Sequence, residues 1–203
     1  MGRTRSISDE QILEAARALF LEHGIEAKTT DIAERAGVSE GTIFKRFRTK
    51  ENLFLKAMVP ESRLPWADDL DELVGRGDLR ENLEKIAMDM IDFFLEMIPK
   101  MNMVLSQNFE LKRHIMNDPE APPLVGLRKL SRYFDQEQRA GRIRRCDSEV
   151  LARLFLGALH HYSFAERMGI NDRMPLSQST YARGVVATIL DGVIIQEQQD
   201  SGE

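Results

Sequence analysis

The chain has little of what disulfide-bonded, membrane and β-sheet proteins require. Its 203 residues include a single cysteine, Cys146, which excludes an intramolecular disulfide and suits a reducing compartment. No apolar run approaches the roughly 20 residues of a membrane-spanning helix, and no signal-peptide pattern precedes the first expected helix. Strand-like alternation is not sustained anywhere, whereas helical periodicity is. These features predict a soluble, cytoplasmic, all-α protein without membrane partners.

Motifs for catalysis or metal binding are also lacking. The sequence contains no H-E-x-x-H, P-loop or G-x-S-x-G motif. His160 and His161 are adjacent and therefore about 100° apart around a helix, a poor arrangement for one metal ion. Glu110 and His114 share a helix face, but no second His or Cys accompanies them. We therefore expect neither an enzyme nor a metal site, and no cofactor.

Charge is distributed unevenly along the chain. The formal net charge is −5, yet residues 1–60 hold ten Lys and Arg against nine Asp and Glu. The acidic excess thus lies beyond residue 60. Such a balance argues against a non-specific nucleic-acid coat, but it allows a sequence-specific binder with a small basic patch.

Residues 29–50, TTDIAERAGVSEGTIFKRFRTK, carry two short helical patterns joined by a tight turn. Apolar residues recur at helical spacing before the turn (Ile32, Ala33, Ala36) and after it (Ile43, Phe44, Phe47). Gly37 suits the turn, and Ser39 is a good N-cap for the second helix. Two short helices crossing at such a turn form a helix-turn-helix. A solvated helical hairpin on a small bundle has the same local pattern.

The flanking residues favour the DNA-binding interpretation. Ser8 and Gln11 form a capping box that starts a helix, and Gly24 is a fitting terminator for it. Thr49 can cap a fourth helix that leads toward Pro60. Packing of these helices behind the helix-turn-helix supplies the core that the hairpin alone lacks.

With these helices in this order, residues 8–58 resemble the N-terminal DNA-binding domain of the tetracycline-repressor (TetR) family of bacterial transcription regulators. The matching segments are ILEAARALFLEHG, T-DIAERAGVSEGTIFKRF and TKENLF. The resemblance implies an all-α homodimer of about nine helices per chain. Residues 1–58 would form a three-helix helix-turn-helix domain, and residues 59–203 a helical domain for ligand binding and dimerisation.

Carried over by position, the resemblance implies one set of DNA contacts: Thr29, Thr30, Ser39, Glu40, Gly41, Thr42, Phe44, Lys45, Arg46 and Lys50. Short residues at the start of the recognition helix let it enter a major groove, where Thr can meet a base edge or a thymine methyl. Phe44 replaces the usual Tyr, so a phosphate-binding hydroxyl is missing. Lys45 and Arg46 replace an aromatic and a His, which makes this end more cationic.

Beyond residue 60 the periodicity predicts further helices. Pro65 to Gly77 form a connector, Asp78 caps a long helix, and Pro99 is expected to end that helix. Further helices are expected through Met103 and from Leu124 to Gly141.

Methionines and aromatics concentrate in the middle of the chain, as in an adaptable apolar pocket. The pocket candidates are Trp66, Met90, Phe93, Phe94, Met97, Met101, Phe109, His160 and Tyr162. Taken singly, each residue is better explained as core. As a group, and with the family resemblance, they predict a site for a small, largely apolar effector.

The last two helices are apolar over more than one face, so they must be buried on both sides. We expect them to form a four-helix bundle with a second copy, the interface candidates being Leu151, Leu154, Phe155, Ala158, Val185, Ile189, Gly192 and Val193. The alternative is a wholly intramolecular bundle.

The sequence therefore predicts a homodimeric transcriptional repressor that binds a double-stranded, pseudo-palindromic operator and is released from it by the effector. A dimer is expected because one recognition helix buries too little surface for a tight specific site. The alternative is a constitutive architectural DNA-binding protein without a ligand, which the apolar middle of the chain disfavours.

Overall fold

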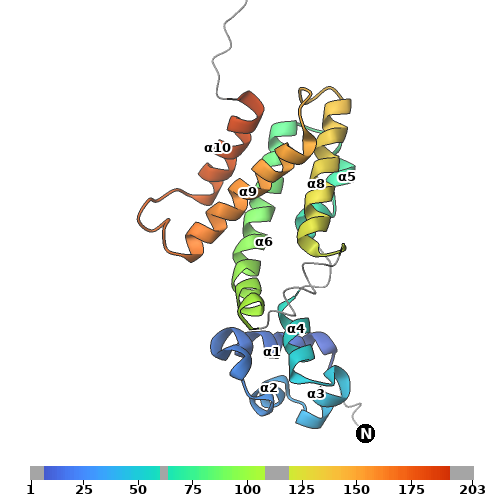
Figure 1. Ribbon diagram of the computed structural model, residues 1–203, viewed down its shortest axis with the longest axis vertical. Coiled ribbons are helices and arrows are strands. Elements are labelled where there is room, and N and C mark those ends of the chain that lie inside the picture. The colour runs from blue at the N-terminus through green and yellow to red at the C-terminus, as the bar shows by residue number, and fades with distance from the viewer. Residues whose placement is uncertain (1–6, 60–63, 108–118, 193–203) are drawn as a thin grey trace, which may run out of the picture. The chain divides into compact units, whose positions relative to one another are not determined.

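The computed structural model describes residues 7–59, 64–107 and 119–192 (Figure 1). Within these ranges every regular element is helical, with nine α-helices and two short 3-10 helices. The predicted all-α fold is confirmed. As far as they are described, the residues group into two compact units, one containing 1–63 and 96–122, the other 64–95 and 123–203.

The first unit is built on four N-terminal helices and a short 3-10 turn. These are α1 (Asp9–His23), η1 (Gly24–Glu26), α2 (Thr29–Ala36), α3 (Glu40–Phe47) and α4 (Lys50–Met58). Phe20 of α1 and Phe54 of α4 are buried at its centre with their rings edge to face, 5.1 Å between centroids. Val104, far along the chain, is fully buried in the same core. The core of this unit therefore needs more of the chain than its first 58 residues.

Local sequence determines where these helices start. The Ser8 hydroxyl accepts from the backbone N–H of Gln11, and the Gln11 side chain accepts from the backbone N–H of Ser8, which confirms the predicted capping box. Ser39 caps α3 and Thr49 caps α4, also as predicted. Each cap satisfies an N–H group that the first turn leaves unpaired.

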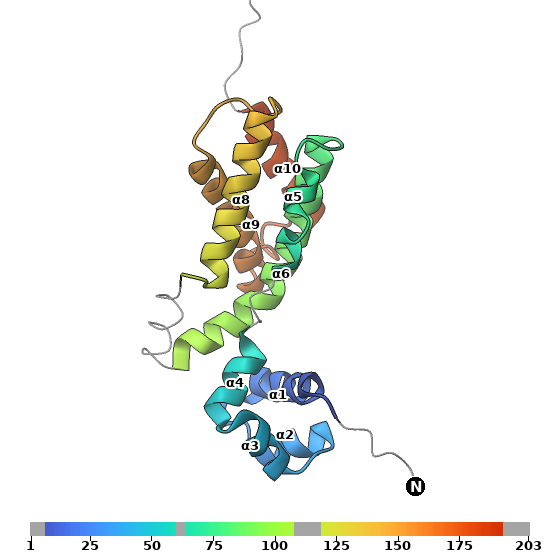
Figure 2. The same ribbon diagram turned by 90° about the vertical axis from the view of Figure 1, so that its right-hand side faces the viewer.

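The second unit comprises η2 (Pro65–Ala67), α5 (Leu70–Leu73), the first part of α6 (Leu79–Gln107), α8 (Pro122–Arg139), α9 (Ser148–Arg167) and α10 (Gln178–Asp191). In Figure 1 and Figure 2, α8 and α9 lie beside the first half of α6. Their inward faces share one apolar core, in which Phe134 of α8 meets Phe155 of α9 at 5.9 Å between ring centroids. Gly126 admits the Trp66 ring, since an added Cβ would lie only 3.0 Å from it.

Helix α6 does not end at Pro99, contrary to the sequence prediction. It is continuous from Leu79 to Gln107, with Pro99 inside it. A proline has no N–H to give to the carbonyl four residues earlier, which here is that of Leu95. The Arg167 guanidinium donates to that carbonyl through Nε at 2.9 Å and also through Nη2. The helix can continue because another donor satisfies the exposed carbonyl.

A buried ion pair connects the segment after α5 with the end of α8 in the second unit. The Glu137 carboxylate is fully buried, accepts from the Gly75 N–H at 3.2 Å, and lies 3.2 Å from the Arg142 Nε. Arg142 also donates to the Arg76 carbonyl at 3.0 Å. Removing either charge would leave its partner buried and unpaired, which is costly.

Candidate DNA-binding interface

The turn between α2 and α3 fixes how the two helices meet. Gly37 has φ 68° and ψ 32°, the left-handed conformation, and its N–H bonds back to the end of α2. The side chain of Ile7 lies against it, 3.6 Å from the position a Cβ would take. A residue with a side chain would be strained here, so glycine holds the helix-turn-helix angle.

The start of α3 presents a small, polar surface. The Ser39 hydroxyl accepts from the Thr42 N–H at 3.2 Å and lies 2.9 Å from the Thr42 hydroxyl. Gly41 is exposed, and Glu40 is partly exposed beside it. The Ser39–Thr42 pair holds the Thr42 side chain in one orientation, while Gly41 leaves room for close approach. A helix start of this kind can enter a groove and present Thr42 to a base edge.

The end of α3 separates buried from exposed residues sharply. Ile43 and Phe47 are buried in the core, whereas Phe44 is 43% exposed and Lys45 is exposed. Arg46 Nη1 instead donates within the protein, to the Ile7 carbonyl at 2.6 Å and to Asp9 Oδ1 at 2.9 Å. Of the two adjacent cations predicted to contact DNA, only Lys45 extends from the protein without a partner in the described part of the chain.

Arg48, which follows α3, was not among the predicted contacts. It has φ 69° and ψ −55°, and the Thr49 N–H bonds to the Phe47 carbonyl across it at 2.8 Å. This is a γ-turn of the rare, strained kind. Backbone strain of this sort concentrates at functional sites. Sequence pattern gave no indication of it, because an arginine is an unexpected residue at positive φ.

The predicted DNA contacts at the starts of α2 and α4 differ in accessibility. Thr29 is only 8% exposed, while Thr30 is exposed and donates to Asp31 Oδ1 at 3.1 Å. Lys28 is the N-cap of α2, so Thr29 and Thr30 are its first two residues. Lys50 is the first residue of α4. Hydrogen bonds from the first turn, chiefly a backbone N–H, lower the pKa of Glu51, so this helix start stabilises negative charge.

The predicted effector-pocket residues divide between the two units. Met97 and Met101 belong to the first, the others that are described belong to the second, and Phe109 lies outside the described residues. Trp66 and Met90 are buried in the core of the second unit. Phe94 contacts His160, with 5.3 Å between ring centroids, and the Tyr162 hydroxyl donates to the Leu176 carbonyl at 2.9 Å. These contacts are those of packed core residues.

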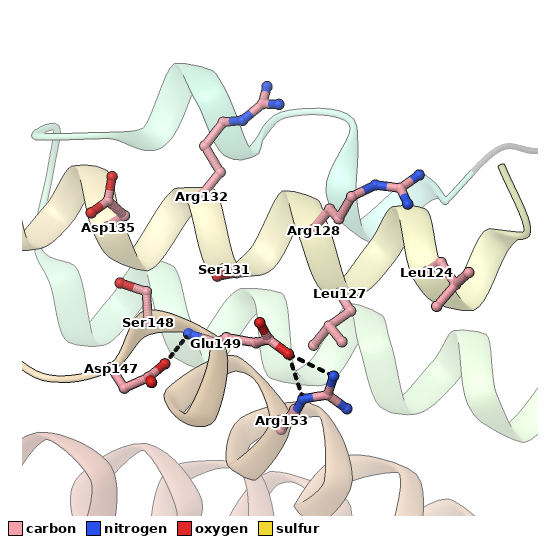
Figure 3. Close-up of a pocket in the computed structure, with 10 residues that line it drawn as sticks. All are labelled: Leu124, Leu127, Arg128, Ser131, Arg132, Asp135, Asp147, Ser148, Glu149 and Arg153. Carbon is pink, nitrogen blue, oxygen red and sulfur yellow. Dashed lines mark hydrogen bonds and ion pairs between the residues drawn. The ribbon is translucent and has the colours of Figure 1, made fainter. Parts of the chain in front are cut away.

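A surface hollow of about 750 Å³ lies elsewhere, between α8 and the start of α9 (Figure 3). It contains none of the predicted pocket residues. Arg153 and Glu149 form a pair of hydrogen bonds across one helical turn of its wall, at 3.0 and 2.6 Å. Figure 3 shows Arg128 and Arg132 directed away from that pair. Leu127 points from α8 toward Arg153, so the hollow is lined by both apolar and charged side chains.

The predicted interface residues do not all face the same way. Phe155 is fully buried in the core of its own chain and has no surface to offer a partner, which corrects its assignment. Leu154 is 62% exposed, Leu151 and Ala158 are partly buried, and Val193 lies outside the described residues. On α10, Val185 and Ile189 pack partly into the same core, and Gly192 is exposed.

Helix α9 nevertheless carries an exposed stripe. We define the α9 stripe as five exposed residues of α9 and its C-cap, at alternating spacings of four and three: Val150, Leu154, Gly157, His161, Phe164 and the C-cap Met168. Such alternation is the seam pattern of packed helix pairs. The stripe is apolar apart from His161 and the small Gly157.

Two kinds of feature are absent from the described residues. No group of three or more His, Cys, Asp or Glu side chains there is arranged to hold a metal ion. Nor does any described helix combine the length and apolar character needed to cross a bilayer.

Comparisons with known proteins agree with this geometry. Residues 12–57 match the family model described as bacterial regulatory proteins, tetR family. The HTH-type transcriptional repressor AcnR of Corynebacterium glutamicum is 34% identical over 113 residues, which are 55% of this chain and 53% of that relative. The chain thus spans about half the length of the curated relatives it matches. These relatives are transcriptional regulators, a class distinct from enzymes.

Solved structures share the fold over almost the whole chain. A TetR-family transcriptional regulator from Mesorhizobium loti has a TM-score of 0.68 at 21% identity, covering 93% of this chain and 98% of that one. The regulator FadR of Bacillus subtilis, in complex with stearoyl-CoA, has a TM-score of 0.64 at 16% identity, covering 92% and 100%. Residues 12–57 thus match the helix-turn-helix segment of the TetR family of bacterial regulatory proteins, and the chain has the same fold as these solved regulators.

Proposed function

We propose that the protein is a homodimeric transcriptional repressor that binds a pseudo-palindromic operator through α3. The observation that carries the proposal is the exposed face of α3, with Thr42 held by Ser39 at its start and Lys45 at its end. Residues 1–58 supply this DNA-binding surface, and residues 59–203 supply dimerisation and control.

The DNA contacts are assigned by what each exposed side chain offers. Ser39, Glu40, Gly41 and Thr42 enter the major groove, where Thr42 reads a base edge. Thr30, Phe44, Lys45 and Lys50 flank the groove and meet the backbone, Phe44 by packing alone. Lys50 is the first residue of α4, where the positive end of the helix dipole favours a phosphate.

Dimerisation rests on the α9 stripe. Its large apolar members are 39% to 63% exposed, which is costly in water and is relieved by packing against a second copy. Two copies related by a dyad then present two α3 helices to successive major grooves. Leu151, Ala158 and the partly buried residues of α10 border this contact.

Control by an effector requires a connection between the sensing and binding regions. Helix α6 provides it, because its first part packs in the second unit while Val104, near its end, is buried in the first. An apolar effector that inserts among Trp66, Phe93, Phe94 and their neighbours would bias the dimer toward a state with lower DNA affinity. It can do so only through different affinities for the two states. Because FadR, a fold neighbour, is in complex with stearoyl-CoA, that compound is a reasonable first probe.

The direct test is selection of bound DNA from a random pool by the purified protein. We expect recovery of a palindromic sequence, since a symmetric dimer reads two equal half-sites. Recovery of no preferred sequence would contradict the proposal and favour the architectural alternative.

Two substitutions at the interface should separate reading of bases from binding of phosphate. We call the magnitude of the negative slope of log affinity against log salt the salt slope; Lys50→Ala removes one phosphate contact per half-site and should lower it by about 1.8 per dimer. Thr42→Ala should leave the slope unchanged and relax preference at one base pair, by about 1 kcal/mol or more. The measurement is a salt titration of binding to the selected operator and to single-base variants. An unchanged slope in Lys50→Ala would refute the phosphate assignment.

A further inference from the structure

The guanidinium of Arg46 joins the end of α3 to the start of α1. A single nitrogen, Nη1, donates both to the Ile7 carbonyl and to Asp9 Oδ1, at 2.6 and 2.9 Å. The Arg46 side chain is 29% exposed, so the group is partly shielded from water. Hydrogen bonds to charged groups are stronger than neutral ones, and this nitrogen makes two contacts at once.

The residues held by Arg46 are themselves fixed. Ile7 packs against the apolar core and lies against Gly37 at the helix-turn-helix turn. Asp9 is the first residue of α1, directly after the Ser8 capping box. The end of α3, the turn before it and the start of α1 are thereby connected through one arginine. Without that connection, only the packing of its buried face would hold α3 in position.

The same contacts make Arg46 a poor phosphate ligand. Asp9 lies 2.9 Å from its nitrogen and cancels its charge locally. A DNA phosphate approaching the guanidinium would face this carboxylate at short range, and breaking the pair would cost its hydrogen bonds. Lys45, the next residue in the sequence, is exposed and carries no such acid against it within the described chain.

We infer that Arg46 is a positioning residue for DNA recognition. Together with Asp9 and the Ile7 carbonyl it forms a clamp that sets the orientation of α3, and it makes no phosphate contact of its own. This inference rests on the proposed DNA-binding function and revises the role that the sequence suggested for Arg46.

The experiment compares Arg46→Ala, Asp9→Ala and Lys45→Ala in salt titrations on the selected operator. The clamp predicts about a tenfold loss of specific affinity in both Arg46→Ala and Asp9→Ala, with the salt slope of the wild type. The double variant should bind no more weakly than either single one, because both remove the same connection. Lys45→Ala should instead lower the slope by about 1.8 per dimer.

Glu10→Ala is the matched control for Asp9→Ala. Both residues are acids in the first turn of α1, so both substitutions remove the same charge and the same favourable interaction with the helix dipole. Glu10 pairs only loosely with Arg17, at 3.6 Å on the surface. We expect Glu10→Ala to bind at least as tightly as the wild type.

The inference is overturned if Arg46→Ala lowers the salt slope by about 1.8 and Asp9→Ala tightens binding, as a phosphate-binding arginine released from an acid would do. Hydrogen exchange without DNA tests the clamp separately. Amides in the last turn of α3 should exchange faster in both clamp variants and not in Glu10→Ala. If the wild-type protein selects no DNA sequence, the proposed function fails, and hydrogen exchange still shows whether Arg46 fixes α3.

Discussion

Arg48 keeps a side chain where the backbone favours glycine. At φ 69° its Cβ crowds the chain, at a cost of about 1–2 kcal/mol. Arg48→Gly should remove that strain, but glycine also raises the entropy of the unfolded chain. We expect a net gain of up to about 1 kcal/mol in unfolding free energy, measured by urea denaturation, together with weaker DNA binding because a cation is lost.

Arg48→Ala is the control, since it removes the same charge and keeps the strain. Both variants should lose equal DNA affinity, and only the glycine variant should gain stability. Equal stability of the two variants would show that the strain at Arg48 is no larger than the cost of the extra entropy that glycine gives to the unfolded chain.

His160 links the stability of the second unit to pH. Partial burial, aided by neighbouring His161, lowers the pKa of His160. Between about 6.5, the ordinary value, and the lowered folded value, the unfolded chain binds more protons than the folded one. Stability should therefore fall as the pH decreases through that window and stay level above it.

The measurement is the thermal midpoint at several pH values from 7.5 to 5. His160→Gln should flatten the decline below about pH 6.5. A profile in His160→Gln that parallels the wild type would exclude His160 as the source.

At the scale of elements, helix starts were predictable because each is decided within four residues. The caps at Ser8, Ser39 and Thr49 all depend on a side chain bonding to an N–H three positions on. The prediction that α6 ends at Pro99 was wrong because its continuation depends on a residue distant in sequence. The donor that rescues the Leu95 carbonyl is Arg167, 72 residues away, and no local pattern contains it.

The compensation at Pro99 can be tested by a double-mutant cycle. Arg167→Met should cost about 1.5–3 kcal/mol, because it leaves the Leu95 carbonyl without its charged donor. In a Pro99→Ala background the helix regains the N–H of residue 99, so the same substitution should cost much less. Urea denaturation of the four proteins measures the coupling, and additive effects would refute the compensation.

The recognition surface shows the same limit of sequence reasoning. The family pattern located α3 and its exposed residues, yet it gave Arg46 and Lys45 the same role. Their difference comes from Asp9 and Ile7, which lie 37 and 39 residues away in sequence and meet Arg46 only in the folded chain. The position of a residue on a helix was predictable, whereas its tertiary partner was not.

At the scale of the whole molecule, the sequence predicted the positions of helices better than it predicted which face of each helix is buried. Leu154 and Phe155 were both predicted at the dimer interface, but adjacent residues point about 100° apart on a helix. In the fold Phe155 enters the core and Leu154 remains 62% exposed. A helix apolar on two faces does not reveal which face its own chain covers, because both faces have the same composition.

That distinction gives the last prediction. Leu154→Glu places a charge in the middle of the α9 stripe and should convert the proposed dimer to monomer in sedimentation velocity at micromolar concentration, without unfolding the chain. Leu21→Glu is the control, because Leu21 is also exposed, at 42%, but lies on α1. Since each monomer carries one recognition helix, Leu154→Glu should also lose most affinity for a two-half-site operator while retaining binding to non-specific DNA. A Leu154→Glu protein that remains dimeric would place the interface elsewhere.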